Sequence, residues 1–396
     1  MIQPRQLGVY LQVPFCEAKC TFCNFSSRVG RPSDLVRYTQ ALGQEISHLP
    51  EFYRARGLPT DVLSAPVDTI YFGGGTPTLL GEEGLAEVVG ALRAAFLADA
   101  VEEFTIELTP GSAGEPLLQA MRKLGINRLS LGAQTFNDRE LRAVGRLHSA
   151  EEITAQVRLA GRAGFTNISL DLIAGLPYQT EASWRKTVER ALQAAPSHVS
   201  VYLYELDEHS RLGQEALQQG TRYHADQLPG EAFVVWAYEW AREQLAAAGY
   251  APYEISNFAL PGFESRHNLK YWRLQPYVGL GAGAHSFDGE RRWSNRVEVA
   301  HYESCLESGE PPLAQLRRLS LSEQVEEFFF LGLRRQEGID LTEATERWGA
   351  GALQPWRRTL EALISDGWLE RANSRVRLSP PAVLVSNEIF QEFITA

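Results

Sequence analysis

Short runs of apolar and β-branched residues recur along the first half of the chain, and each has the length of a buried strand. The runs cover residues 8–13, 68–72, 104–108, 128–132, 167–172 and 198–204. Between them, apolar residues stand three and four positions apart, which is the spacing of an amphipathic helix. Strands that alternate with helices in this way predict an α/β fold with a parallel sheet, curved into a full or partial barrel of six β/α units.

The pattern changes after the sixth run. A long helix is predicted over residues 231–248, and the character changes again at about residue 319. Beyond this point the predicted elements are helices at 321–336 and 353–366, a two-stranded wing at 368–370 and 375–378, and a last helix at 383–394. We therefore divide the chain into a barrel domain with its extension, residues 1–318, and a small C-terminal winged-helix-like α+β domain, residues 319–396.

Charge and length exclude several classes of function. The formal net charge is −11 over 396 residues, whereas phosphate recognition requires a basic surface, so nucleic acid is not an expected partner. Acidic residues on its predicted helices make the C-terminal domain a cover or docking module rather than a DNA-binding one. No apolar run reaches the roughly 18 residues of a membrane span, and no signal peptide is recognised. We expect a soluble, cytoplasmic protein.

Three of the four cysteines lie within eight positions, just after the first predicted strand. They are Cys16, Cys20 and Cys23, spaced Cys-x3-Cys-x2-Cys. Three crowded thiols cannot all pair as disulfides, which are also rare in the cytosol. A structural zinc site would need a fourth ligand, and the nearest histidine is His48. Thiolates also hold iron–sulfur clusters, and three of them on a [4Fe-4S] cubane leave one iron open. The spacing favours this cluster.

Glycines and polar residues follow successive predicted strands at the same end. Gly74 and Gly75 lie in the turn after the second strand, where a missing side chain lets a ligand approach the backbone. Polar residues that end or follow the third, fourth and fifth strands are Glu107, Gln134, Arg146 and Asp171. A glycine-rich turn or a lone buried polar residue is usually structural. One polar group per strand, at the edge where barrels carry their chemistry, is better explained by a shared ligand.

The cysteine spacing at the end of a first strand resembles the radical S-adenosylmethionine (SAM) superfamily. The resemblance implies that Cys16, Cys20 and Cys23 bind a [4Fe-4S] cluster whose open iron chelates the amino and carboxylate groups of SAM. Reductive cleavage of SAM would then give a 5′-deoxyadenosyl radical.

Within this superfamily, residues 7–380 resemble the oxygen-independent coproporphyrinogen III oxidases and the heme chaperones called HemW. The segments that carry the likeness are 10–23, 71–78, 130–137, 171–177 and 279–286. The resemblance implies a SAM pocket made of Tyr10, Gly74, Gly75, Glu107, Gln134, Arg146 and Asp171. In it Tyr10 would pack on cluster and SAM, and the two glycines would cradle the methionine amino end. An arginine fork suits a carboxylate, and acidic groups suit ribose hydroxyls or an ammonium.

Residues 267–272 read His-Asn-Leu-Lys-Tyr-Trp. Histidine can ligate heme iron, and Tyr271 and Trp272 offer flat apolar surface to a macrocycle. A hydrogen-bonded structural histidine is the ordinary alternative. The pattern His-Asn-x-x-Tyr-Trp resembles HemW, and this resemblance implies that His267 contacts heme.

Two functions remain open, an enzyme that oxidatively decarboxylates coproporphyrinogen III with SAM and a carrier that binds heme and passes it on. The resemblance to the oxidases breaks down at Phe25, where they carry a further cysteine, and at His285, which matches the chaperones. The segment that oxidases carry before the cluster is also not found ahead of Cys16. We therefore predict a heme chaperone of the radical SAM family rather than an active oxidase.

The cofactors that this resemblance implies are a [4Fe-4S] cluster, S-adenosyl-L-methionine and heme. The implied partners are heme, apo-heme acceptor proteins and an electron donor. The resemblance leaves open a peripheral membrane contact during heme delivery and the formation of a homodimer.

Overall fold

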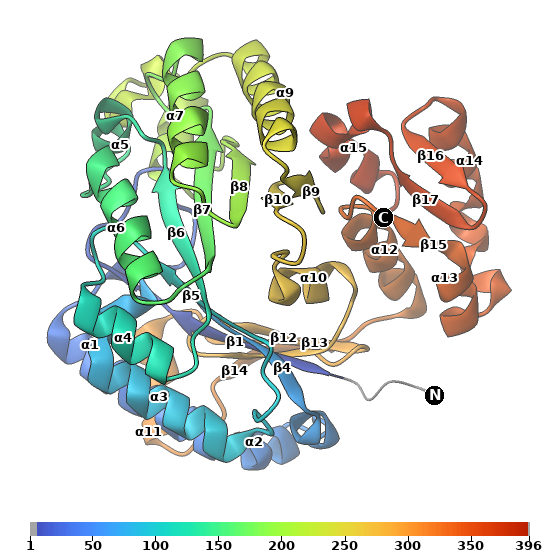
Figure 1. Ribbon diagram of the computed structural model, residues 1–396. Coiled ribbons are helices and arrows are strands. Elements are labelled where there is room, and N and C mark those ends of the chain that lie inside the picture. Colours follow the sequence, from blue (N-terminus) through green and yellow to red (C-terminus); the bar gives the residue numbers. More distant parts are fainter. Residues whose placement is uncertain (1–5, 395–396) are drawn as a thin grey trace.

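All six predicted strands are present in the computed structural model, which describes residues 6–394 (Figure 1). They are β1 (Leu7–Val13), β4 (Val67–Gly74), β5 (Glu103–Leu108), β6 (Arg128–Gln134), β7 (Asn167–Ala174) and β8 (His198–Leu203). These strands are neighbours in the order β1-β4-β5-β6-β7-β8, and every pair is parallel. The predicted partial barrel of six β/α units is therefore confirmed.

Helices on the outside of the sheet cover it, as a parallel sheet requires. They are α1 (Pro32–Ser47), α2 (Leu49–Ala55), α3 (Gly81–Ala95), α4 (Glu115–Lys123), α5 (Asp138–Ala143), α6 (Ala150–Arg162), α7 (Glu181–Gln193) and α9 (Glu231–Ala247). In contrast, α8 (Arg211–Leu217) lies beside the cysteine segment, where the Leu212 N–H donates to the Thr21 carbonyl at 2.9 Å. Val9 and Leu11 of β1, at most 1% exposed, share one continuous core with Leu42 of α1 and Val88 of α3. Tyr10 alternates with them and therefore lies on the inner face of the barrel.

Six further strands extend this sheet at both edges, and the sequence did not reveal them. On one side β8 is followed by β10 (Asn257–Ala259) and β9 (Ala251–Pro252). On the other side β1 is followed by β11 (Tyr277–Leu280), β12 (His285–Phe287), β13 (Arg291–Asn295) and β14 (Leu313–Arg318). Only β11 continues the parallel arrangement, and the others pair antiparallel. These strands do not stand out as apolar runs in the sequence, because most are short and β13 and β14 contain arginines.

A buried carboxylate fastens the added strands to α1. The Glu45 side chain accepts hydrogen bonds from the Gly281 backbone N–H at 2.7 Å, Asn295 Nδ2 at 2.5 Å and the Tyr302 hydroxyl of α11 (Val299–Glu307) at 2.6 Å. Burial raises the pKa of Glu45, and the three donors oppose that rise. Such a satisfied polar network fixes the position of the elements that it joins.

The end of the barrel at which its strands begin is closed by α10 (Arg266–Trp272). The carboxylate of Glu103, the first residue of β5, accepts hydrogen bonds from the backbone N–H groups of Arg266 at 2.8 Å and His267 at 2.9 Å. A carboxylate at this place satisfies the free N–H groups of the first helical turn and complements the helix dipole. Lys270 of α10 forms a buried ion pair with Asp68 of β4, with 2.7 Å between Nζ and Oδ1.

The C-terminal part forms a separate lobe beside this end of the barrel (Figure 1). It contains α12 (Leu321–Gly332), α13 (Leu341–Trp348), α14 (Arg357–Ser365) and α15 (Ser386–Gln391) around a sheet with the order β15 (Ile339–Asp340), β17 (Arg375–Leu378), β16 (Leu369–Ala372). The two predicted wing strands are present, and β15 adds a third strand to them. The predicted helices at 353–366 and 383–394 each begin with a 3-10 turn, the first of which contains Pro355. The small α+β lobe is thereby confirmed.

The core of this lobe also includes side chains from the barrel extension. Leu274, Tyr277 and Phe287 are buried in the same apolar cluster as Phe329 and Phe393. The rings of these two phenylalanines are stacked at 4.4 Å. The boundary at residues 318 and 319 stays a prediction, because this core contains residues from both sides of it.

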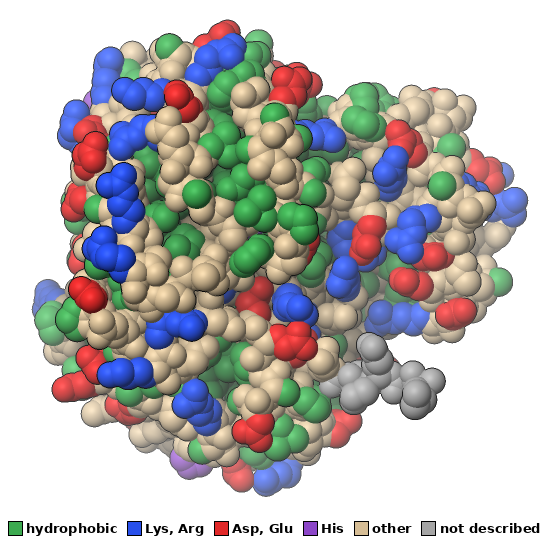
Figure 2. Space-filling model, in the orientation of Figure 1, with side chains coloured by type: hydrophobic (Ala, Val, Ile, Leu, Met, Phe, Trp, Pro, Cys, Tyr) green, Lys and Arg blue, Asp and Glu red, His purple; other side chains and the backbone are tan. Residues whose placement is uncertain are grey.

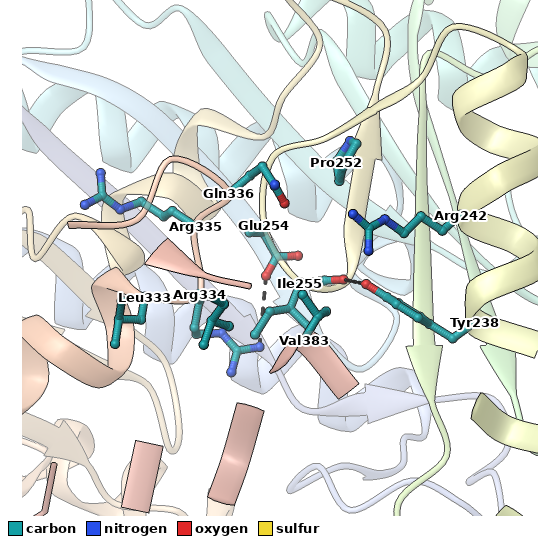
Figure 3. Close-up of a pocket in the computed structure, with 11 residues that line it drawn as sticks. Tyr238, Arg242, Pro252, Glu254, Ile255, Leu333, Arg334, Arg335, Gln336 and Val383 are labelled. Carbon is teal, nitrogen blue, oxygen red and sulfur yellow. Dashed lines mark hydrogen bonds and ion pairs between the residues drawn. The ribbon is translucent and has the colours of Figure 1, made fainter. Parts of the chain in front are cut away.

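A polar contact between the barrel extension and the lobe adds to this apolar one. Figure 3 shows the Glu254 carboxylate directed toward the Arg334 guanidinium, with 4.0 Å between Oε2 and Nη2. Glu254 is 2% exposed and also forms a backbone bridge with Arg335. The pocket at this place has a volume of only about 10 Å³, enough for one water molecule but for no larger ligand.

Candidate functional site

The cysteine segment forms a compact loop at the end of β1. The two residues of β2 (Phe15–Cys16) pair in parallel with β3 (Arg28–Val29), which closes the loop at its base. The backbone N–H of Thr21 donates to the carbonyl of Val144 at 3.0 Å and so joins the loop to the chain that follows β6. Cys20 is 8% exposed, and Cys16 and Cys23 are half-buried.

The donor set of this loop is three cysteine sulfurs, a set that can hold an iron–sulfur cluster. In residues 6–394, no three histidine, cysteine or acidic side chains gather closely enough to hold one ion. Ligands of a single ion must meet at one point, whereas cysteines on a cubane bind different iron atoms. Burial raises the pKa of the Cys16 and Cys23 thiols, so a positively charged group is needed to hold them as thiolates.

The glycine turn after β4 presses directly against this loop. A Cβ on Gly75 would lie 2.3 Å from the Phe15 carbonyl oxygen, and one on Gly74 would lie 2.4 Å from Gln12 Nε2. Gly74 also has a φ of +106°, which side chains rarely allow. The close packing of the chain on itself is therefore enough to require both glycines, and their contact with SAM stays a prediction.

Glu107 points from β5 toward the same turn. Its carboxylate accepts hydrogen bonds from the Tyr71 hydroxyl at 2.8 Å and from the Gly74 backbone N–H at 3.0 Å. Burial raises the pKa of Glu107 to about 7, and the nearby Asp171 adds to the rise. The ring of Tyr10 stacks on that of Tyr71 at 6.0 Å between centroids. A buried acid with a pKa near neutrality is a common feature of binding and catalytic sites.

Asp171 lies deeper in the barrel than predicted, because β7 continues to Ala174 instead of ending at residue 172. Its carboxylate accepts hydrogen bonds from serine hydroxyls on three strands, Ser200 at 2.8 Å, Ser130 at 3.1 Å and Ser169 at 3.4 Å. Burial raises the pKa of Asp171, and the serines oppose the rise. These hydroxyls compensate for much of the cost of burying a carboxylate.

Arg146 connects the cysteine loop to the edge of β6. Its Nη2 donates to the Gly132 carbonyl at 2.7 Å, and its Nη1 lies 3.5 Å from Cys20 Sγ. At the end of β6, Gln134 follows an irregularity in the pairing with β7 and has a φ of +65°. A non-glycine residue held in this region costs energy and is often found at functional sites. The predicted cysteines, glycines, Glu107, Gln134 and Arg146 thus occupy the same end of the barrel.

His267 is not in this group. Its side chain is fully buried nearer the start of the strands, where Nδ1 lies 2.9 Å from Thr69 Oγ1 and Nε2 lies 2.8 Å from the Tyr271 hydroxyl. Its ring packs on that of Tyr71, with 5.3 Å between centroids, and so lies beneath the Glu107 group. Burial lowers its pKa to about 3, so the imidazole is neutral. In this conformation both ring nitrogens have partners, and neither is free to coordinate iron. A contact between His267 and heme stays a prediction that would require α10 to move.

The partners of these residues were not predicted from the sequence. The Tyr71 hydroxyl donates to the Glu107 carboxylate. The Tyr10 hydroxyl donates to Gln12 Oε1 at 2.5 Å. The period-two alternation of strands would have placed Tyr71 and Gln12 on the inner face, together with Tyr10 and Gly73. The serines around Asp171 could have been noticed as the hydroxyls inside otherwise apolar strands.

Comparisons with known proteins agree with this arrangement. The family model for the radical SAM superfamily matches residues 10–191, and the model for the HemN C-terminal domain matches residues 319–385. A solved structure of the coproporphyrinogen III oxidase HemN from Escherichia coli, described as a radical SAM enzyme, is 25% identical. It aligns with a TM-score of 0.85 over 99% of this chain and 91% of its own.

Two curated relatives cover almost the whole chain. The heme chaperone HemW of Bacillus subtilis is 33% identical over 388 residues, which are 98% of this chain and 99% of that protein. The heme chaperone HemW of Mycobacterium tuberculosis (strain H37Rv) is 33% identical over 393 residues, 98% of this chain and 94% of its own. The chain therefore belongs to the HemW family of the radical SAM superfamily.

Proposed function

We propose that this protein is a heme chaperone that holds a [4Fe-4S] cluster and SAM at one end of its barrel and delivers heme to acceptor proteins. Membership of the radical SAM superfamily implies the cluster and SAM, and the names of the HemW relatives imply heme. The observation that carries the choice of chaperone over oxidase is Phe25. Phe25 lies in the cysteine loop and is 63% exposed. At this position the oxidases that the chain resembles carry a further cysteine.

Each residue of the strand-end site has a part in this proposal. Cys16, Cys20 and Cys23 would hold the cluster, and Arg146 would place a positive charge beside the Cys20 sulfur. Glu107 and Asp171 would meet the positively charged and hydroxyl groups of SAM. When bound, the cluster and SAM together supply one-electron chemistry. Within the described residues, no helix is both long and apolar enough to cross a bilayer.

SAM affinity is expected to fall as the pH decreases through about 7. Glu107 has a pKa of about 7, with Tyr71, Asp171 and Arg128 as the other ionisable groups around it. Above this pH its carboxylate is charged and attracts the sulfonium of SAM, and below it the carboxylate is neutral. Affinity should therefore decrease by up to roughly tenfold per pH unit below 7. Equilibrium dialysis of the reconstituted protein between pH 6 and 8.5, with iron content followed in parallel, measures this dependence.

The Glu107→Gln variant provides the control for this experiment. It keeps the shape of the side chain but cannot ionise, so it should bind SAM weakly with a flat pH profile. A flat profile in the wild type would remove Glu107 from the proposed SAM site.

Parallel assays of heme transfer and porphyrin oxidation test the proposed function itself. Anaerobically reconstituted protein should take up hemin and pass it to an apo-hemoprotein, and it should not convert coproporphyrinogen III in the presence of SAM and a reductant. A genuine oxidase serves as the positive control for the second assay. The structural likeness to HemN makes oxidation the second candidate. Efficient conversion to protoporphyrinogen IX would overturn the proposal in favour of the oxidase.

A further inference from the structure

A second cleft, of about 410 Å³, lies between the end of α10 and the C-terminal lobe. One wall consists of Trp272 and the residues that follow it, and the other consists of side chains from α12, α13 and β17. Figure 2 shows positively and negatively charged side chains gathered where the smaller lobe meets the barrel. In contrast to the pocket in Figure 3, this space is large enough for an organic ligand.

The two walls of the cleft contribute aromatic rings. Trp272 comes from the barrel side, and Phe328 and Trp348, in edge contact at 5.6 Å, come from the lobe. Trp272 is half-buried, and its Nε1 has no hydrogen-bond partner among the described residues. Arg334 lies over one face of Trp272 and Arg347 over one face of Trp348, each 4.6 Å from the ring centroid, and Phe328 is 7% exposed. The remaining surface of the two tryptophans suits the edge or face of a flat, apolar molecule.

The charged residues of the lining give it an excess of two positive charges. Four arginines, Arg273, Arg335, Arg347 and Arg375, stand against Glu337 and Glu343. Glu337 is shared, since its Oε1 lies 2.6 Å from Arg335 and 3.3 Å from Arg273. Arg375 reaches Asp340, outside the lining, only at 3.8 Å. Arginine forks are well suited to carboxylates, so the cleft favours a ligand with two acidic groups.

We propose that this cleft is the heme site, with the macrocycle between Trp272 and Trp348 and the two propionates on the arginines. The inference rests on the proposed function and adds a location to it. Heme combines a flat apolar ring with two carboxylates at one edge, which matches both features of the lining. The two ends of the His-Asn-x-x-Tyr-Trp segment then have different roles. Buried His267 helps to anchor α10, and Trp272 lines the cleft.

This location has two consequences for a carrier. The lining contains no histidine, cysteine, methionine or tyrosine, so it offers the iron no strong axial ligand. Heme held by stacking and propionate contacts alone is easier to pass to an acceptor that does supply a ligand. The cleft also adjoins the end of the barrel closed by α10, whereas the cysteine loop follows the opposite ends of the strands. Cargo and cluster would therefore lie on opposite sides of the packed rings of Tyr10, Tyr71 and His267.

Hemin titrations of the full-length protein test the location. The variant Arg273→Glu/Arg375→Glu reverses two lining charges whose side chains are 43% and 47% exposed, so the fold should tolerate it. Its affinity for hemin should be at least roughly tenfold weaker than that of the wild type. The matched control Arg357→Glu/Arg371→Glu makes the same change of charge on exposed residues of this lobe outside the lining, and it should bind hemin as the wild type does.

Hemin dimethyl ester, in which both propionates are uncharged, provides the second probe. It should bind the wild type more weakly than hemin, and the cleft variant should not weaken it further. If the wild type binds hemin but the cleft and control variants are indistinguishable, the location is wrong while the chaperone function stands. Equal affinity of the wild type for hemin and its ester would also overturn it. If the wild type binds no hemin at all, the proposed function fails.

Discussion

Replacing Cys20 by alanine is expected to abolish the broad absorption at roughly 400 nm that thiolate-bound iron gives the reconstituted protein. Cys20 is the most buried of the three cysteines in the loop, and its sulfur lies next to Arg146. Two remaining thiolates cannot hold a cubane that already has one iron without a protein ligand. Cys16→Ala and Cys23→Ala should have the same effect, with iron and sulfide contents below those of the wild type.

Cys305→Ala is the matched control for these variants. Cys305 lies on α11, away from the cysteine loop, and its replacement should leave the absorption and the iron content unchanged. A triple variant of the loop that still assembles a cluster with the wild-type spectrum would contradict the assignment. Loss of the cluster in Cys305→Ala would show that the fourth cysteine had been overlooked as a ligand.

The second large effect is expected for SAM binding. Arg146→Ala and Asp171→Asn should each weaken SAM affinity, because each removes the charge from one side of the proposed pocket. Loss of one charge-assisted hydrogen bond costs about 1.5–3 kcal/mol, or roughly 10- to 150-fold in affinity. Asparagine keeps the shape of Asp171 and can still accept from the surrounding serines, so the strands should remain in place.

Iron content separates an effect on SAM from an effect on the cluster. Both variants should keep their iron, although Arg146 contacts the Cys20 sulfur. Arg142→Ala, an exposed residue in the last turn of α5, is the control and should bind SAM normally. Unchanged SAM affinity in both Arg146→Ala and Asp171→Asn would exclude the strand-end pocket as the SAM site.

The parts of this fold that the sequence predicts are those encoded by contiguous residues. The six barrel strands are recognised because each is a short run rich in apolar and β-branched residues, and the cysteine loop because its ligands are neighbours in the chain. Strands such as β14 are not recognised because five of its six residues are exposed. The lobe helix α12 ends at Gly332, before the predicted residue 336, and Ile339 packs against this glycine.

The surroundings of the candidate site depend on residues far apart in the sequence. Nothing near His267 indicates that Thr69 would occupy one of its ring nitrogens or that Glu103 would hold its helix. The depth of Asp171 likewise depends on Ser200, which is brought beside it by strand pairing. The sequence therefore identifies the chemical groups, whereas only the fold shows which of them are accessible to a ligand.

The shared core of the lobe has a consequence for the order in which the protein is made. Tyr277 and Phe287 leave the ribosome early, but they are covered by a cluster that includes Phe393. At the usual rates of synthesis, roughly 5–20 s separate the appearance of Phe287 from that of Phe393. During this interval β11 and β12, which contain these two residues, carry an uncovered apolar surface. This surface can therefore be covered only when the chain is nearly finished.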